Sequence, residues 1–131
     1  MIEILSFEHD TKLFMILNIY NPNIESEQVK TLKIIDTIMQ KIYNLYEHNI
    51  IMGGDWNFII DNNLDAYGGS PSLKLNSLAE YIKIKEKYEL CDIFRVRNPA
   101  KKRFTFRQRT PTLSRRLDFF HYFGFNSRLC G

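Results

Sequence analysis

The feature that most constrains the fold is a pair of short apolar runs separated by a long stretch with helical spacing. The first run, Leu13–Tyr20, shows little alternation, which predicts a strand buried on both faces. Asn21-Pro22-Asn23 then stops the strand with turn residues. Ser26 offers an N-cap, and apolar residues at spacings of three and four predict an amphipathic helix over roughly 26–47. The second run, over 49–52, predicts another short buried strand.

The rest of the chain continues this succession of strands and helices. Phe58-Ile59-Ile60 is apolar enough to extend the second strand, and the polar stretch 61–72 predicts a loop. Apolar spacing predicts a second helix over 73–88, and two further strands are expected at Arg103–Arg107 and Arg116–Phe123. A chain of 131 residues suits one domain. The order therefore predicts a single layered α/β or α+β domain over the whole sequence.

Positive charge is concentrated in one segment. The net charge is +3, and residues 95–116 contain nine basic and no acidic residues. Phe104 and Phe106 interrupt this segment, which indicates an ordered strand rather than a disordered tail. Such a basic segment is compatible with binding nucleic acid. The longest apolar run, Leu13–Leu17, is far too short to cross a membrane, so a soluble intracellular protein is expected.

The sharpest candidate for chemistry is Gly53-Gly54-Asp55-Trp56-Asn57, directly after a predicted strand. Two glycines allow a sharp turn and the close approach of a ligand. Asp55 can orient a water or hold a hard cation, and Asn57, two residues on, can donate to a phosphate oxygen. The structural alternative is an Asx-type turn in which both side chains bond to the local backbone.

Two further side chains are candidates, each with a structural alternative. Tyr20 stands at a strand exit, where its hydroxyl can donate to an anionic ligand or simply reach solvent from the core. Asp118 lies between bulky apolar residues of a predicted strand, where an unpaired carboxylate is costly. Its partner is either catalytic or a neighbouring arginine.

In this order, the motifs resemble those of the endonuclease/exonuclease/phosphatase superfamily, most closely the DNA-nicking domain of LINE-type (non-LTR) retrotransposons. The segment 18–23 is similar to the family's N-x-Y-x-P-N strand end, and 53–57 to its G-G-D-[FW]-N signature. The segments 103–106 and 114–120 are similar to the [FY]-T-[FW] … S-R-[IL]-D-[YF] stretch of the LINE-type branch. The likeness spans about 13–123.

The resemblance implies part of a four-layered α/β sandwich of the DNase I-like type, without its first strands and its last strand. It also implies Mg²⁺-dependent cleavage of a DNA phosphodiester. By analogy, Tyr20 would contact the scissile phosphate, Asp55 would position the attacking water and ligate the metal, and Asn57 would steady the phosphate. Asp118 would orient a general-base histidine.

The resemblance also implies how DNA would be bound. Thr105 would lie at the rim of the DNA-binding surface, with Arg103, Arg107 and Arg115 contacting the nucleic acid. The expected partner is DNA, without a membrane and without a cofactor other than the metal. A monomer acting in the nucleus is expected.

The family pattern is incomplete in this sequence. The metal-binding Glu of the family lies upstream of the first motif, and the Ser-Asp-His strand with the base lies downstream of the last. Asp118 therefore lacks a histidine to orient, because His121, on the same strand, should face the other side by alternation. Weak or absent nuclease activity is expected. The alternatives are a non-catalytic nucleic-acid-binding remnant, or a phosphatase or abasic-site nuclease of the same superfamily.

Overall fold

The computed structural model describes residues 1–46 and 49–123, which form two sheets and three helices. The large sheet has the strand order β1-β2-β3-β8-β5, and the small sheet has the order β4-β7-β6. No helix in the described ranges is long and apolar enough to cross a membrane. In chain order the elements are β1 (Ile2–His9), β2 (Lys12–Tyr20), α1 (Glu25–Ile42), β3 (Ile50–Asp55), β4 (Ala66–Tyr67), α2 (Leu75–Lys87), β5 (Cys91–Asp92), α3 (Ile93–Arg97), β6 (Phe106–Gln108), β7 (Leu113–Arg115) and β8 (Asp118–Phe123).

The large sheet mixes parallel and antiparallel neighbours. β1 and β2 form an antiparallel hairpin, whereas β2 and β3 are parallel and are joined by the crossover helix α1. β8 lies antiparallel between β3 and β5, although it follows both of them in the chain. The connections therefore bring residues near 55 and near 118 side by side in the middle of the sheet.

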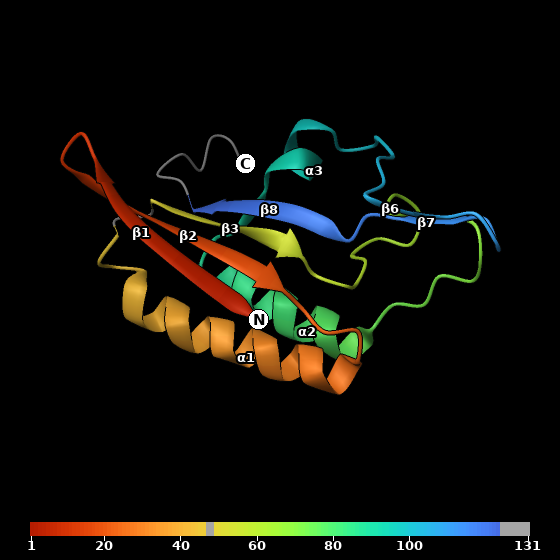
Figure 1. Cartoon of the computed structure of the whole chain (residues 1–131), viewed down its shortest axis with the longest axis horizontal. Helices are drawn as coiled ribbons and strands as arrows, with labels where there is room; N and C mark the ends of the chain where they lie inside the picture. Colours follow the sequence, from red (N-terminus) through yellow and green to blue (C-terminus); the bar gives the residue numbers. More distant parts are fainter. Residues whose placement is uncertain (47–48, 124–131) are drawn as a thin grey trace.

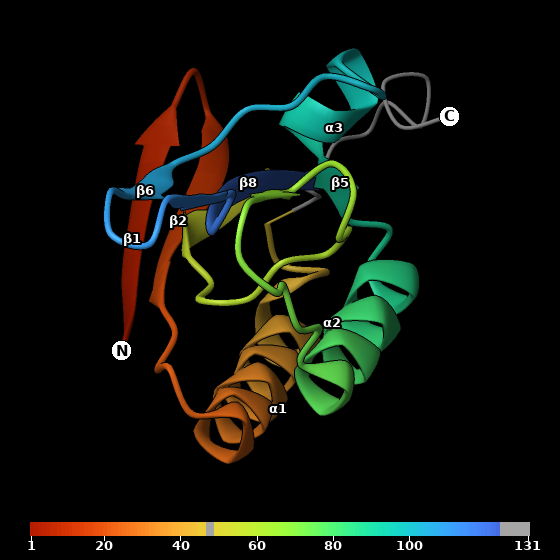
Figure 2. The same cartoon turned by 90° about the vertical axis from the view of Figure 1, so that its right-hand side faces the viewer.

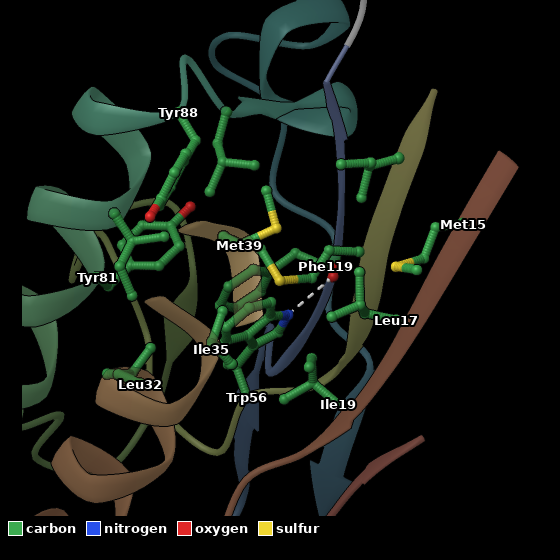
Figure 3. Close-up of a cluster of buried hydrophobic side chains, with 14 of the residues drawn as sticks. Met15, Leu17, Ile19, Leu32, Ile35, Met39, Trp56, Tyr81, Tyr88 and Phe119 are labelled. Carbon is green, nitrogen blue, oxygen red and sulfur yellow. Dashed lines mark hydrogen bonds between the residues drawn. The ribbon is translucent and has the colours of Figure 1, made fainter. Parts of the chain in front are cut away.

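Helices α1 and α2 lie together on one face of the large sheet, and α3 lies on the opposite side (Figure 1). Figure 2 shows the two long helices packed side by side under the strands. The core fills the space between them and the sheet. Figure 3 shows its members meeting from both layers, with Leu17 and Ile19 from β2, Leu32 and Ile35 from α1, and Trp56 after β3, each at most 1% exposed.

The prediction that the strand at 13–20 is buried on both faces is wrong. Met15, Leu17 and Ile19 face the helices and are nearly inaccessible, whereas Asn18 and Tyr20 on the other face are exposed. The physical reason is that α1 and α2 cover only one face of the sheet. Among the described elements, only the short α3 packs on the other side, over β8.

The predicted helices are confirmed, but the expected cap is not. α1 and α2 occupy most of the predicted ranges, yet α1 ends at Ile42 rather than near 47. Its N-cap is Ile24, without a side-chain hydrogen bond, and Ser26 lies inside the first turn. Glu25 and Glu27 in that turn place negative charge at the positive end of the helix dipole instead.

The strand predictions in the second half are confirmed only in part. The strand expected at 116–123 is β8, but the one expected at 103–107 begins at Phe106 and pairs with β7, which the sequence did not predict. Phe58 and Ile59 are buried but are not in a strand, and Phe58 packs on the core beside Trp56. β1 was also missed, and eight residue pairs with β2 hold it in place.

Candidate active site

Three of the predicted site residues lie in one row across the large sheet. Tyr20 of β2 is the register partner of Asp55 of β3, which in turn is the register partner of Asp118 of β8. Side chains directly opposite on adjacent strands share a face, with Cβ atoms about 5 Å apart. The row therefore brings one phenol and two carboxylates together, on the face turned away from α1 and α2. Tyr20 is 54% exposed, and both aspartates are half-buried.

The glycines before Asp55 make this close arrangement possible. A Cβ on Gly54, whose φ is +138°, would lie 2.0 Å from the carbonyl oxygen of Ile19 on β2. A Cβ on Gly53 would lie 2.0 Å from the ring of Phe120 on β8. Glycine is therefore required at 54, where the obstacle is the backbone of β2, whereas the obstacle at 53 is a side-chain ring that can turn.

Trp56 fixes the end of β3 to β8. Its backbone N–H donates to the carbonyl of Leu117 at 2.8 Å, and its indole Nε1 donates to the carbonyl of Phe119 at 2.9 Å. The Trp56 and Phe119 rings stack with centroids 5.3 Å apart. These contacts of Trp56 hold Asp55 and Asp118 in register.

Asn57 takes part in the local turn that the sequence left open as the structural alternative only through its backbone N–H, because its side chain bonds to a distant backbone group. Its backbone N–H donates to Asp55 Oδ1 at 3.0 Å, and its φ is +52°. Its side-chain Nδ2 donates to the carbonyl of Asn21 at the exit of β2. The carbonyl of Asn57 accepts from Gln28 Nε2 at 2.9 Å and Lys74 Nζ at 3.0 Å. Asn57 thus ties three loops together at the edge of the row.

The pKa of Asp55 responds to its surroundings in the row. Burial raises the pKa of Asp55, the N–H of Asn57 opposes this rise, and the negative charge of Asp118 adds to it. Like charges directly opposite on adjacent strands destabilise a sheet unless a proton or a cation compensates them. Among the described residues, no group of three or more His, Cys, Asp or Glu side chains could hold a metal ion. Two carboxylates fit Mg²⁺ only when waters or substrate oxygens complete the octahedron.

Thr105 holds the backbone beside Asp118 in place. Its Oγ1 accepts hydrogen bonds from the backbone N–H groups of Leu117 at 3.0 Å and Asp118 at 3.1 Å. These bonds fix the start of β8, and Thr105 remains exposed. The sequence predicted Thr105 at the rim of the DNA-binding surface, and the structure shows it next to Asp118.

A buried ion-pair network beside the row was missed in the sequence. Arg116 donates through Nε to Asp65 at 2.8 Å and through Nη2 to Asp92 at 2.6 Å, and Arg95 donates to Asp65 at 2.7 Å. Among the described ion pairs, Asp118 has no arginine partner, so the structural alternative for this residue is wrong. The buried position of Asp92 beside Leu90 and Cys91 was the available signal, because a buried carboxylate needs a partner.

The described histidines lie away from the row. His121 is completely buried on the helix side of β8, where its Nε2 lies 2.5 Å from the hydroxyl of Tyr81. This confirms the prediction that His121 and Asp118 face opposite sides. His9 lies at the far end of β1, paired with Lys12 beside the hairpin turn. His48 is outside the described residues.

Basic side chains gather around a hollow on the small sheet. Arg103 and Arg107 line this basic hollow of about 580 Å³, together with Lys101, Lys102 and Phe104. A second hollow of about 500 Å³ adjoins it, because Arg103 also lines that one, with Thr105 and Asp118. The two hollows therefore form a continuous path from the basic side chains to Asp118 of the row.

Two other arginines of the basic segment are engaged within the chain. Arg115 is half-buried and donates to the carbonyls of Tyr67 at 3.0 Å and Ser114 at 2.8 Å. Arg116 belongs to the ion-pair network. Neither therefore has its full set of donors available for a ligand.

Comparison with known proteins identifies the fold. The sequence matches no family model and no curated protein sequence. The structure is similar to that of the AP endonuclease LMAP from Leishmania major, with a TM-score of 0.62 and 20% identity over 92% of this chain and 44% of that one. It is also similar to the endonuclease domain of TRAS1, a telomere-specific non-LTR retrotransposon, with a TM-score of 0.55 and 13% identity over 92% of this chain and 55% of that one.

These similarities show that the chain has a DNase I-like α/β fold, as the sequence motifs predicted. The chain spans about half the length of the two solved structures. Both neighbours are endonucleases, and one belongs to the retrotransposon branch suggested by the sequence. The predicted fold is therefore confirmed.

Proposed function

We propose that this chain is a DNA-binding endonuclease lobe of the non-LTR retrotransposon kind, whose row of Tyr20, Asp55 and Asp118 receives one phosphodiester. The observation that carries the proposal is the register of this row within a DNase I-like fold. The row offers a hydroxyl donor and two carboxylates, with Asp55 one side-chain spacing from both Tyr20 and Asp118. The basic hollow nearby offers positive charge for the flanking phosphates.

Each residue of the row has a role that follows from its position. Tyr20, exposed at the strand end, donates its hydroxyl to a phosphate oxygen, and Asp55 accepts a hydrogen bond from the attacking water. Asn57 holds the loop against Asp55 through its backbone N–H and against Asn21 through its side-chain amide. The second N–H of that amide would steady the phosphate. Asp55 and Asp118 would hold Mg²⁺, which when bound neutralises the charge that develops on the phosphoryl oxygens.

This site alone supports slow chemistry. Efficient hydrolysis needs a base within hydrogen-bond reach of the nucleophile. Within the described ranges, neither His9 nor His121 lies beside Asp118. A positioned general base contributes about 10²–10⁴-fold in rate. We therefore expect binding of DNA with weak or no nicking by this chain.

Plasmid nicking tests the proposal directly. Supercoiled DNA is incubated with the chain in Mg²⁺ or EDTA, and the open-circular product is quantified for wild type, Asp55→Asn and Asp10→Asn. Asp10 is the matched control because it lies at the β1–β2 turn, 86% exposed. Slow Mg²⁺-dependent nicking that Asp55→Asn alone removes supports the site. Nicking that survives Asp55→Asn would show that the row does not carry the activity, and fast nicking would refute the expected low rate.

A second candidate function is binding of nucleic acid without catalysis, which the basic hollow favours. Each phosphate contact contributes about 0.9 to the slope of log affinity against log salt on duplex DNA. Neutralising Arg103, Arg107 and Arg109 to glutamine should flatten this slope, whereas glutamine at Lys33 and Lys41 on α1 should not. An unchanged slope would contradict the assignment. Binding together with an inert row would favour the non-catalytic function over the nuclease.

The alternative substrates within the superfamily are an abasic site and a phosphomonoester. Structural similarity to an AP endonuclease is the reason to test the abasic site as a substrate. Competition between an intact duplex, a duplex with an abasic site and a phosphomonoester separates them. Preferential cleavage of the abasic duplex would replace the retrotransposon assignment with a repair-type nuclease.

A further inference from the structure

A glutamine in the first turn of α1 contacts the exits of both β2 and β3 and is completely buried. Gln28 is 0% exposed, although glutamine is mostly an exposed residue and loses much rotamer freedom on burial. Its Nε2 donates to the carbonyl of Pro22 at 2.7 Å and to the carbonyl of Asn57 at 2.9 Å. Gln28 therefore joins the chain that follows Tyr20 to the chain that follows Asp55.

The orientation of the Gln28 amide is fixed by its partners. A carbonyl can only accept a hydrogen bond, so the NH2 group must face Pro22 and Asn57. The Oε1 atom accepts from Ser77 Oγ of α2 at 2.8 Å, and Ser77 is also 0% exposed. Both ends of this amide thus have partners, and these come from the two strand exits and from the second long helix.

Lys74 reaches the same strand exits from the start of α2. Its Nζ donates to the carbonyl of Asn57 at 3.0 Å and to the carbonyl of Asn23 at 2.5 Å. Lys74 is the N-cap residue of α2, where its positive charge is unfavourable beside the positive end of the helix dipole. Its contacts with the two strand exits, rather than the stability of the helix, therefore explain a lysine here. We call Gln28, Ser77 and Lys74 the polar clamp.

The polar clamp holds Asn57 in a conformation that few residues adopt. The φ of Asn57 is +52°, in the left-handed region, and strained backbone of this kind persists where the surrounding contacts determine it. Gln28 and Lys74 both donate to the Asn57 carbonyl, and the Asn57 N–H donates back to Asp55 Oδ1 at 3.0 Å. The polar clamp therefore acts on Asp55 through the backbone of Asn57.

The polar clamp continues the connection between β2 and β3 beyond the sheet. The two strands pair as far as Tyr20 and Asp55, and the N–H of Asn21 donates to the carbonyl of Asp55 at 2.8 Å. Past this point the two chains leave the sheet, and Gln28 joins them at Pro22 and Asn57. The spacing of the Tyr20 and Asp55 side chains thus depends on the polar clamp as well as on the strand pairing.

We propose that Gln28 is a positioning residue for the row, which holds the exits of β2 and β3 so that Tyr20 and Asp55 contact one phosphate. This inference rests on the proposed function of the row. Gln28 acts through Asn57 and does not touch the substrate, because it is completely buried in α1. The helix layer on one face of the sheet thereby sets the geometry of a site on the other face.

Amide hydrogen exchange measured by NMR tests the coupling of Gln28 to Asn57 without any nuclease activity. In Gln28→Met, the Asn57 amide should exchange about 10-fold faster relative to the amide of Met52 inside β3. Gln40→Met is the matched control, because Gln40 is exposed on the same helix, and the exchange ratio should equal that of wild type. Lys74→Met, at a half-buried position, removes one of the two donors and should give a smaller increase. Circular dichroism establishes that each variant is folded.

The affinity for a short DNA duplex in Mg²⁺ tests whether this coupling reaches the row. Gln28→Met and Tyr20→Phe should each weaken binding about 10-fold, because each disturbs a hydrogen bond to a charged phosphate. Gln40→Met should bind the duplex as wild type does. The affinity is measured within minutes, before slow nicking consumes the duplex.

Two results would overturn the proposal by itself. One is a ratio of Asn57 to Met52 exchange that stays at the wild-type value in both Gln28→Met and Lys74→Met. The other is weaker DNA binding by Tyr20→Phe but wild-type binding by Gln28→Met, since Gln28 would then have only a structural role. Wild-type binding by both variants, together with faster exchange at Asn57, would instead refute the proposed function of the row, and the positioning role would fall with it.

Discussion

Arg116→Met removes the centre of the buried ion-pair network and should be the most destabilising single substitution of a charged residue. The Arg116 side chain is 3% exposed, and its partners Asp65 and Asp92 are 1% and 5% exposed. Methionine fills similar apolar volume but leaves both carboxylates buried without their main cation. Breaking a buried pair in this way costs about 3–5 kcal/mol. That is a large part of the roughly 5–15 kcal/mol that holds a domain folded.

Urea unfolding followed by circular dichroism measures this loss. The control is Lys30→Met on α1, because Lys30 and its partner Glu27 are 70% and 48% exposed, and such pairs contribute about 0.5 kcal/mol at most. Replacing Arg116 by Met together with Asp65 and Asp92 by Leu should recover most of the lost stability, since the buried charges disappear together. A loss below about 1 kcal/mol in Arg116→Met would refute the reasoning.

The pH dependence of the same variant gives an independent check. Burial raises the pKa of Asp92, but the hydrogen bonds and charge of Arg116 outweigh burial and hold it below its ordinary value of 3.8. The folded-state pKa is depressed, so this pair stabilises the chain at higher pH, and its contribution is lost as pH falls through the folded pKa. The difference between wild type and Arg116→Met should therefore narrow below about pH 4. A stability difference between wild type and Arg116→Met that does not change with pH would contradict the ion pair between Arg116 and Asp92.

Two further predictions concern His121 and the glycines. Burial, opposed by the charge of Asp92, lowers the pKa of His121 to about 4, below the ordinary 6.5. The unfolded chain thus binds the proton first, and urea unfolding should show about 2 kcal/mol less stability at pH 5 than at pH 7. His121→Phe should remove much of this dependence of the unfolding free energy on pH. The same pH dependence in the variant and in wild type would show that His121 is not its source. Gly54→Ala should cost more than about 2 kcal/mol, because its Cβ would meet the backbone of Ile19. Gly53→Ala should cost less, because the exposed Phe120 ring can turn away, and equal losses in melting temperature would count against this.

Local patterns in the sequence predicted the elements whose stability is largely local. The spacing of Leu32, Ile35 and Met39 revealed α1, because one buried stripe defines an amphipathic helix. The same reasoning found α2. The end of α1 was placed too late, because apolar residues such as Tyr43 and Tyr46 continue to pack on the core after the helix stops.

Features that depend on distant partners were not predictable in this way. β1 is a strand because β2 pairs with it, and its own sequence carries Glu3, Ser6 and Glu8 among the apolar residues. An apolar run does not reveal how many of its faces are covered, so the open side of β2 was missed.

The candidate site was predicted to the extent that it follows from motifs. Tyr20 and Asp55 were identified at strand ends and Asp118 within a predicted strand, and the structure aligns them in one row. Their catalytic roles remain predictions. The partners of Arg116 could not be found, because Asp65 and Asp92 are separated from it by 51 and 24 residues. Only the completed fold brings these charges together.

The position of β8 between β3 and β5 has a consequence for how the chain acquires this fold. Both neighbours precede β8 in the chain, and the pairing of Ile50 with Phe123 closes a segment of more than 70 residues. Such non-local pairing makes folding slow, because the entropy of loop closure is lost before contacts compensate it. During synthesis, β3 must wait with an unpaired edge until β8 emerges. The middle of the sheet is thus completed late, and with it the row that depends on Asp118.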